Sequence, residues 1–132
     1  MARLRQIARR TVELEGGPGR AELSIVLADD RLVQQLNRQY RQADAPTDVL
    51  AFPAGEPPGP GLPQWLGEVV ISIPTAQRQA AQAGHEWRAE LDLLVVHGVL
   101  HLLGWNDHTP ATRRRMMARQ AEILAVINRE HD

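Results

Sequence analysis

The chain contains no cysteine among its 132 residues. A disulfide framework is therefore excluded, and a purely structural zinc site is disfavoured because thiolates usually close such sites. The absence of cysteine also fits a reducing compartment, and we expect the protein to be cytoplasmic. At this length we expect a single domain, residues 1–132, that is large enough to bury a core of its own.

Long apolar runs are missing as well. No stretch approaches the roughly 18 residues that a membrane-spanning helix needs, so we expect no membrane partner. Residues 1–17 are rich in arginine but lack the apolar segment of a secretory signal, and Glu13 and Glu15 argue against an organelle-targeting segment. This region instead predicts an amphipathic helix packed on the domain, with four apolar residues on one side: Leu4, Ile7, Ala8 and Val12.

Net charge and aromatic residues are both low. A formal charge of -1 neither favours nor excludes nucleic acid as a partner. Aromatic residues make up only 4% of the chain, so base stacking is not predicted as the dominant mode of binding. Arginine clusters can contact RNA phosphates, although solvated helix faces carry similar runs. Two such clusters are present: Arg3, Arg5, Arg9 and Arg10 near the start, and Arg113, Arg114, Arg115 and Arg119 near the end.

Candidate functional residues are concentrated between residues 97 and 108, a stretch that holds three of the five histidines. Residues 86–103 have apolar side chains at helical spacing and no proline, which predicts a helix. On that helix His97 and His101 stand one turn apart on the same face. Two imidazoles in this arrangement can each give a ring nitrogen to one metal ion.

A glycine turn follows this helix. Gly104 is well placed to end it, because glycine adopts the left-handed conformation of a helix C-terminus at little cost. The chain then turns and can bring Asp107 or His108 back over the same face as a third ligand. Two ligands on a helix and a third after a turn are typical of an open catalytic metal site, which keeps one position for water.

The residue after the first of these histidines narrows the chemistry. Metalloproteases with this spacing carry His-Glu-x-x-His, in which the glutamate is the general base, whereas this chain has Gly98 at that position. Peptide hydrolysis of that type is therefore unsupported. A metal ion lowers the pKa of its bound water and polarises a phosphoryl oxygen, so phosphodiester cleavage is compatible with the site.

The rest of the pattern predicts a small α+β domain with one short sheet covered by helices. A loop rich in proline and glycine is expected at 54–63 and a polar turn at 42–46. His85, alone before its helix, is expected at the surface. Strands are predicted at 22–28, 47–53 and 66–72, and further helices at 29–41, 74–83 and 109–129.

With these motifs in hand, the chain resembles the YbeY family of bacterial endoribonucleases that mature ribosomal RNA. The resemblance covers roughly residue 21 to the C-terminus, and its motifs follow one another in the family's order. They are Tyr40-Arg41 with the stretch 47–53, Leu66-Gly67-Glu68, and the histidine stretch 97–108.

The resemblance implies a zincin-like α+β domain with a short mixed sheet and about five helices. It implies a single-strand-specific, metal-dependent endoribonuclease that acts in rRNA maturation, including the 3′ end of 16S rRNA, and in ribosome quality control. One Zn²⁺ per chain would be held by His97, His101 and His108. Arg41 would be catalytic, because a guanidinium stabilises the charge that develops on phosphate. From their position before a strand, Thr47 and Asp48 are expected to contact substrate by orienting Arg41 or lining the cleft, and the alternative is that they only cap that strand.

The partners implied are RNA, in the form of an rRNA precursor, the ribosome or its small subunit, and a ribosomal protein or an assembly GTPase. DNA is not expected. Two other functions stay open. One is an RNA-binding factor in ribosome assembly whose metal is structural, and the other is a metal-dependent hydrolase of another substrate.

Two departures from the family pattern stand out. The third histidine of the family lies six residues after the second, whereas His108 lies seven after His101. Asp107 therefore has the usual ligand spacing, but a loop can absorb one residue, so we favour His108 as the third ligand over Asp107. The family also opens with an edge strand, whereas this sequence opens with the predicted helix, so we expect a sheet that is one strand shorter.

Overall fold

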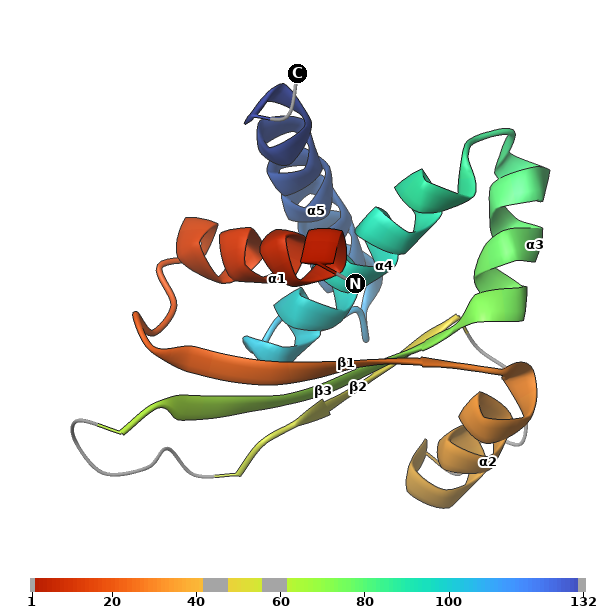
Figure 1. Ribbon diagram of the computed structural model, residues 1–132, viewed down its shortest axis with the longest axis horizontal. Coiled ribbons are helices and arrows are strands. Elements are labelled where there is room, and N and C mark those ends of the chain that lie inside the picture. Colours follow the sequence, from red (N-terminus) through yellow and green to blue (C-terminus); the bar gives the residue numbers. More distant parts are fainter. Residues whose placement is uncertain (1, 42–47, 56–61, 131–132) are drawn as a thin grey trace.

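The computed structural model describes residues 2–41, 48–55 and 62–130, and every predicted helix and strand is found there (Figure 1). The predicted turn at 42–46, most of the predicted loop at 54–63 and Thr47 lie outside the described residues. The elements of the described residues are α1 (Ala2–Leu14), β1 (Ala21–Ala28), α2 (Asp30–Arg41), β2 (Val49–Pro53), β3 (Gln64–Ser72), α3 (Ile73–Ala83), α4 (Trp87–Leu102) and α5 (Pro110–Glu130).

The three strands that the structure describes form one mixed sheet in the order β1-β3-β2. β1 runs parallel to β3, and β2 runs antiparallel to it, which confirms the predicted α+β class. The β1–β3 register shifts between Glu22 and Leu23, where β3 has one extra residue beside Gly67. Gly67 has a φ of 130°, and a Cβ there would clash with the Phe52 carbonyl oxygen, so only glycine fits.

Helices cover both faces of this sheet. In Figure 1, α1, α4 and α5 lie on one side and α2 lies on the other. Successive residues of a strand face opposite sides, so Val69 and Ile71 enter the large core under α4, whereas Val70 packs with Val33 of α2. None of the helices in the described part of the chain is long and apolar enough to cross a membrane.

Helix α4 is the most deeply buried of the described helices and packs against β3. Val95, Val96, Val99 and Leu100 are completely shielded from solvent. A Cβ at Gly98 would lie 2.5 Å from Cγ1 of Val69, a distance that side chains do not tolerate. The glycine is thus required by the close approach of helix and strand, and a glutamate in its place could not be accommodated without moving α4.

The variant Gly98→Ala tests this packing. Alanine favours a helix over glycine by about 1 kcal/mol, but overpacking a tight core costs about 1–3 kcal/mol, so we expect a lower free energy of unfolding. Chemical denaturation measures the change. Shortening Val69 should relieve the overpacking, so Val69→Ala should lower the free energy of unfolding less in the Gly98→Ala background than in the wild type. Strictly additive effects would contradict the proposed contact.

A carboxylate of α2 anchors the start of α3. Asp30 Oδ1 accepts hydrogen bonds from the hydroxyls of Ser72 and Thr75, and Oδ2 accepts one from Arg78 at 2.9 Å. Ser72 also caps α3 through the backbone N–H of Thr75. These bonds, first of all the one from Ser72, favour the ionised carboxylate and lower the pKa of Asp30 from 3.8 to about 2.

This network predicts a pH-dependent contribution to stability. Because the pKa of Asp30 is lower in the folded state than in the unfolded state, its contribution is complete above the ordinary value of 3.8 and is lost as pH falls toward about 2. We expect Asp30→Asn to lower Tm at pH 7 and to match the wild type more closely near pH 2. The matched control is Asp29→Asn, for which we expect no such change in Tm. Asp29 caps α2 by accepting from the N–H of Leu32, and asparagine also caps a helix.

Candidate metal centre

His97 and His101 face each other on the last turns of α4, as their spacing predicts. Their Nε2 atoms lie 3.1 Å apart, and the two rings meet edge to face with centroids 4.7 Å apart. Two nitrogens that bind the same tetrahedral zinc ion, each at about 2.0–2.1 Å, are separated by about 3.3 Å. The observed spacing is therefore close to that of two ligands of one ion.

The other nitrogen of each ring has an oxygen partner. His97 Nδ1 lies 2.9 Å from Oε1 of Gln120 on α5, and His101 Nδ1 lies 3.0 Å from the carbonyl oxygen of Trp105. A carbonyl oxygen only accepts, so each Nδ1 carries the proton and donates it. A neutral imidazole protonated at Nδ1 has its lone pair at Nε2, where a metal ion binds. Both lone pairs are thus directed at the space between the rings.

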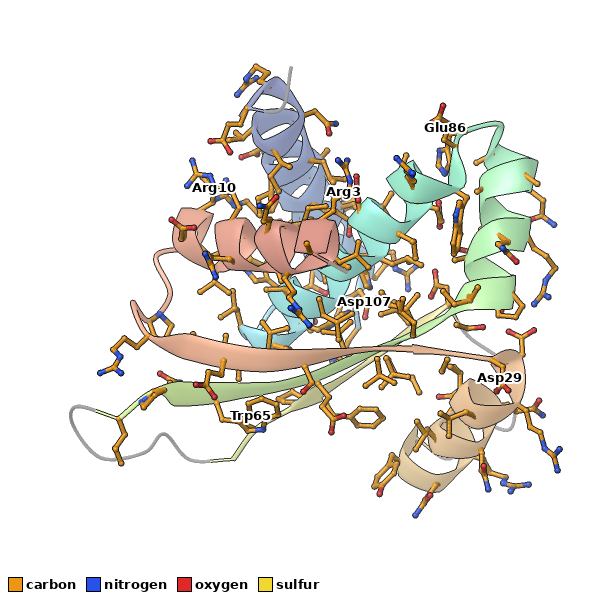
Figure 2. All side chains as sticks on the ribbon, viewed as in Figure 1. Arg3, Arg10, Asp29, Trp65, Glu86 and Asp107 are labelled. Carbon is orange, nitrogen blue, oxygen red and sulfur yellow. The ribbon has the colours of Figure 1, made fainter. Side chains whose placement is uncertain are left out.

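Asp107 completes the group. The chain turns at Gly104, whose φ is 104°, and the N–H of Trp105 donates to the carbonyl oxygen of Leu100. This turn returns Asp107 to α4, on the side of the sheet that carries this helix (Figure 2). Its Oδ2 lies 3.8 Å from Nε2 of His101, and one ligand atom from each of His97, His101 and Asp107 falls within 4.8 Å of the others. These three residues can hold a metal ion.

His108 has a different environment. Its side chain is exposed, its backbone N–H donates to Oδ1 of Asn106, and it is not a member of the His97–His101–Asp107 group. Of the two candidates for a third ligand, Asp107 is thus the one that lies with the helix histidines. The assignment of His108 as a ligand stays a prediction, and the experiment below distinguishes the two.

The turn that carries Asp107 is tied to two distant helices. Trp105 Nε1 donates to Oε1 of Glu15, just after α1, and Arg119 of α5 donates from Nε to Oε2 of the same carboxylate, both at 2.6 Å. The bond to Glu15 raises the pKa of Arg119, and its guanidinium also donates to the carbonyl oxygen of Leu14. These contacts hold Trp105, whose own carbonyl orients His101.

His97, His101 and Asp107 line a small pocket of about 190 Å³. It lies beside β2, an edge strand of the sheet, and is lined by Asn37, Asp48, Val49, Leu50, Ala51, His97, Gly98, His101 and Asp107. A larger groove of about 860 Å³ runs between α1 and β1 past Trp65. Arg5 and Arg9 of the first arginine cluster line it, but none of the predicted metal-binding, catalytic or substrate-binding residues does.

The other predicted site residues have different outcomes. Asp48 lines the pocket, and its contact with substrate stays a prediction. Arg41 is the last residue of α2, and its side chain is not described, while Thr47 lies outside the described residues. Asn37, a buried residue of α2, was missed by the sequence reasoning. Its signal was a polar residue four positions after the buried Val33, on the inward side of that helix.

A family model described as Endoribonuclease YbeY matches residues 1–128. The chain belongs to this family. A protein named Endoribonuclease YbeY from Moorella thermoacetica is 45% identical, with 95% of this chain and 85% of that protein aligned. A relative of the same name from Anaeromyxobacter dehalogenans is 52% identical over 78% of this chain and 52% of its own length.

A solved structure agrees with the fold. The solution structure of a Thermotoga maritima protein superposes with a TM-score of 0.62 at 26% sequence identity. The match covers 92% of this chain and 77% of the other. The small α+β domain is therefore shared beyond close relatives, and the YbeY family membership expected from the motifs is confirmed.

The contact between Gln120 and His97 predicts a role for α5 in metal binding. Residues that orient a ligating histidine typically contribute 10- to 100-fold to metal affinity, so we expect Gln120→Leu to weaken zinc binding by about that factor. Competition with a chromophoric chelator measures the affinity. Gln120→Glu keeps an acceptor oxygen for Nδ1 of His97 and should bind zinc more tightly than Gln120→Leu does. Equal affinity of the wild type and Gln120→Leu would contradict this role.

Proposed function

We propose that this chain is a zinc-dependent endoribonuclease in which His97, His101 and Asp107 hold one metal ion. The endoribonuclease activity rests on membership of the YbeY family. The metal rests on one observation above all: each histidine has its Nδ1 beside an oxygen, and the two Nε2 atoms lie 3.1 Å apart. Two nitrogens and a carboxylate oxygen leave a fourth position for water, as in catalytic zinc sites.

The charge of the pocket supports a bound cation. Its walls carry the carboxylates of Asp48 and Asp107, and none of the described residues that line it is an arginine. Such a pocket repels a phosphodiester unless a positive charge is supplied. A zinc ion would supply that charge, and would also lower the pKa of a bound water and polarise a phosphoryl oxygen.

In the proposed reaction, the residues of the site have separate roles. His97, His101 and Asp107 would hold the ion, and Asp48 would accept a hydrogen bond from the attacking water. Arg41, at the end of α2, would donate to the phosphate oxygens, since a planar guanidinium binds two of them at once. Peptide hydrolysis of the metalloprotease type is disfavoured, because Val69 occupies the space that a glutamate at position 98 would need.

The substrate we propose is single-stranded RNA in the maturation of ribosomal RNA, including the 3′ end of 16S rRNA, with residues 1–132 acting as one cytoplasmic domain. A role in ribosome quality control and binding to a ribosomal protein or an assembly GTPase belong to the same proposal. The pocket of about 190 Å³ is large enough for one phosphate, and we propose that a single strand presents that phosphate to it.

Metal content tests the ligand set. We expect elemental analysis to find about one zinc per chain in the wild type and in His108→Ala, and little in Asp107→Ala, because a lost ligand weakens the site. Loss in His108→Ala with retention in Asp107→Ala would instead make His108 the third ligand. Full zinc content in both variants would show that neither side chain binds the ion.

Cleavage of a labelled single-stranded RNA separates an enzyme from an assembly factor with a structural metal. A metal supplies several kcal/mol in the transition state, so His101→Ala should cleave at least about 100-fold more slowly. Its circular dichroism and its RNA binding should match those of the wild type. A variant that unfolds would favour the structural metal, and cleavage at the wild-type rate would overturn the metal-dependent mechanism.

A further inference from the structure

Helix α4 carries a buried carboxylate that the metal ligands do not account for. Glu90 is only 5% exposed, and burying a charge is costly unless it is paired. Its Oε2 lies 2.6 Å from Nε2 of His85, which is itself 39% exposed at the surface as expected from the sequence. The second oxygen of this carboxylate faces α3.

Gln79 of α3 stands between this carboxylate and the metal pocket. With its amide nitrogen turned toward both acids, Nε2 lies 2.8 Å from Oε1 of Glu90 and 3.0 Å from Oδ2 of Asp48. An amide NH₂ has two protons to donate and both neighbours only accept, so this orientation satisfies all three groups. The opposite orientation would direct the amide oxygen at two carboxylates.

The result is a continuous polar chain, His85–Glu90–Gln79–Asp48, from the surface to the pocket. Its last member lines the pocket with His97 and His101. Asp48 is also held by its backbone, since its carbonyl oxygen accepts from the N–H of Ser72 at the end of β3. Main chain and side chain of Asp48 are thus fixed by different elements.

We propose that Gln79 and Glu90 are positioning residues that hold the Asp48 carboxylate in place for the reaction. Glu90 orients the amide of Gln79, and the amide in turn fixes one oxygen of Asp48. With that oxygen held by Gln79, the other oxygen of the Asp48 carboxylate is directed toward the attacking water. This inference rests on the proposed function, in which Asp48 accepts a hydrogen bond from that water.

The first test compares Gln79→Leu with a matched control on RNA cleavage. Residues that orient a functional group typically contribute 10- to 100-fold to activity. We therefore expect Gln79→Leu to lower kcat by about that factor, while KM and zinc content stay unchanged. The control is Asp92→Asn. Asp92 is also 5% exposed on α4, is paired with Arg3 and does not line the pocket, so kcat should not change.

Two further variants exclude a merely structural effect. If Gln79 acts through Asp48, Gln79→Leu should lower kcat no further in an Asp48→Asn background. Glu90→Gln keeps the size and shape of the side chain and should also lower kcat. This variant serves as the test if Gln79→Leu does not fold. An independent, additive loss of kcat in the Asp48→Asn background would overturn the proposal.

A measurement without turnover separates this proposal from the proposed function. In ¹H–¹⁵N spectra, the side-chain amide signals of Gln79 should shift in Asp48→Asn and in Glu90→Gln, but not in Asp92→Asn. Unchanged signals would overturn the positioning contact even if RNA is cleaved. A wild type that cleaves no RNA would overturn the proposed function, and the amide shifts would still decide whether Gln79 holds Asp48.

Discussion

The close approach of α4 to β3 at Gly98 is the constraint on which the rest of the structure depends. A helix that touches a strand through a glycine is held at one distance and one rotation, because interiors are close-packed and do not deform continuously. That rotation places the histidines on either side of Gly98, one turn apart, over the β2 edge. The same contact removes the space in which metalloproteases place their general base.

The metal centre is assembled from segments that are far apart in the chain. α4 provides two imidazoles, α5 orients one of them through Gln120, and the glycine turn both orients the other and carries Asp107. Glu15 then joins this turn to Arg119. Because each histidine is oriented by a group from outside its own helix, the site depends on the assembled core rather than on any single helix.

The pocket concentrates negative charge in a protein whose net charge is close to zero. Asp48 and Asp107 line it, and Glu90 lies behind it. The structure limits their mutual repulsion by placing a neutral amide between Asp48 and Glu90 and by pairing Glu90 with His85. A cation between His97, His101 and Asp107 is the complementary charge that such a pocket favours.

Local patterns determined the helices, the strands and the pairing of His97 with His101, because helical spacing and a glycine stop depend only on residues a few positions apart. The α+β class followed from the order of these elements. Local patterns did not predict which residue joins the two histidines, because one residue in a turn decides whether Asp107 or His108 returns to the helix. Asn37, Gln79, Glu90 and Gln120 also look like ordinary helix residues in the sequence. Only the tertiary structure decided which groups they lie beside, because those groups come from other parts of the chain and distances across a core are not encoded in local spacing.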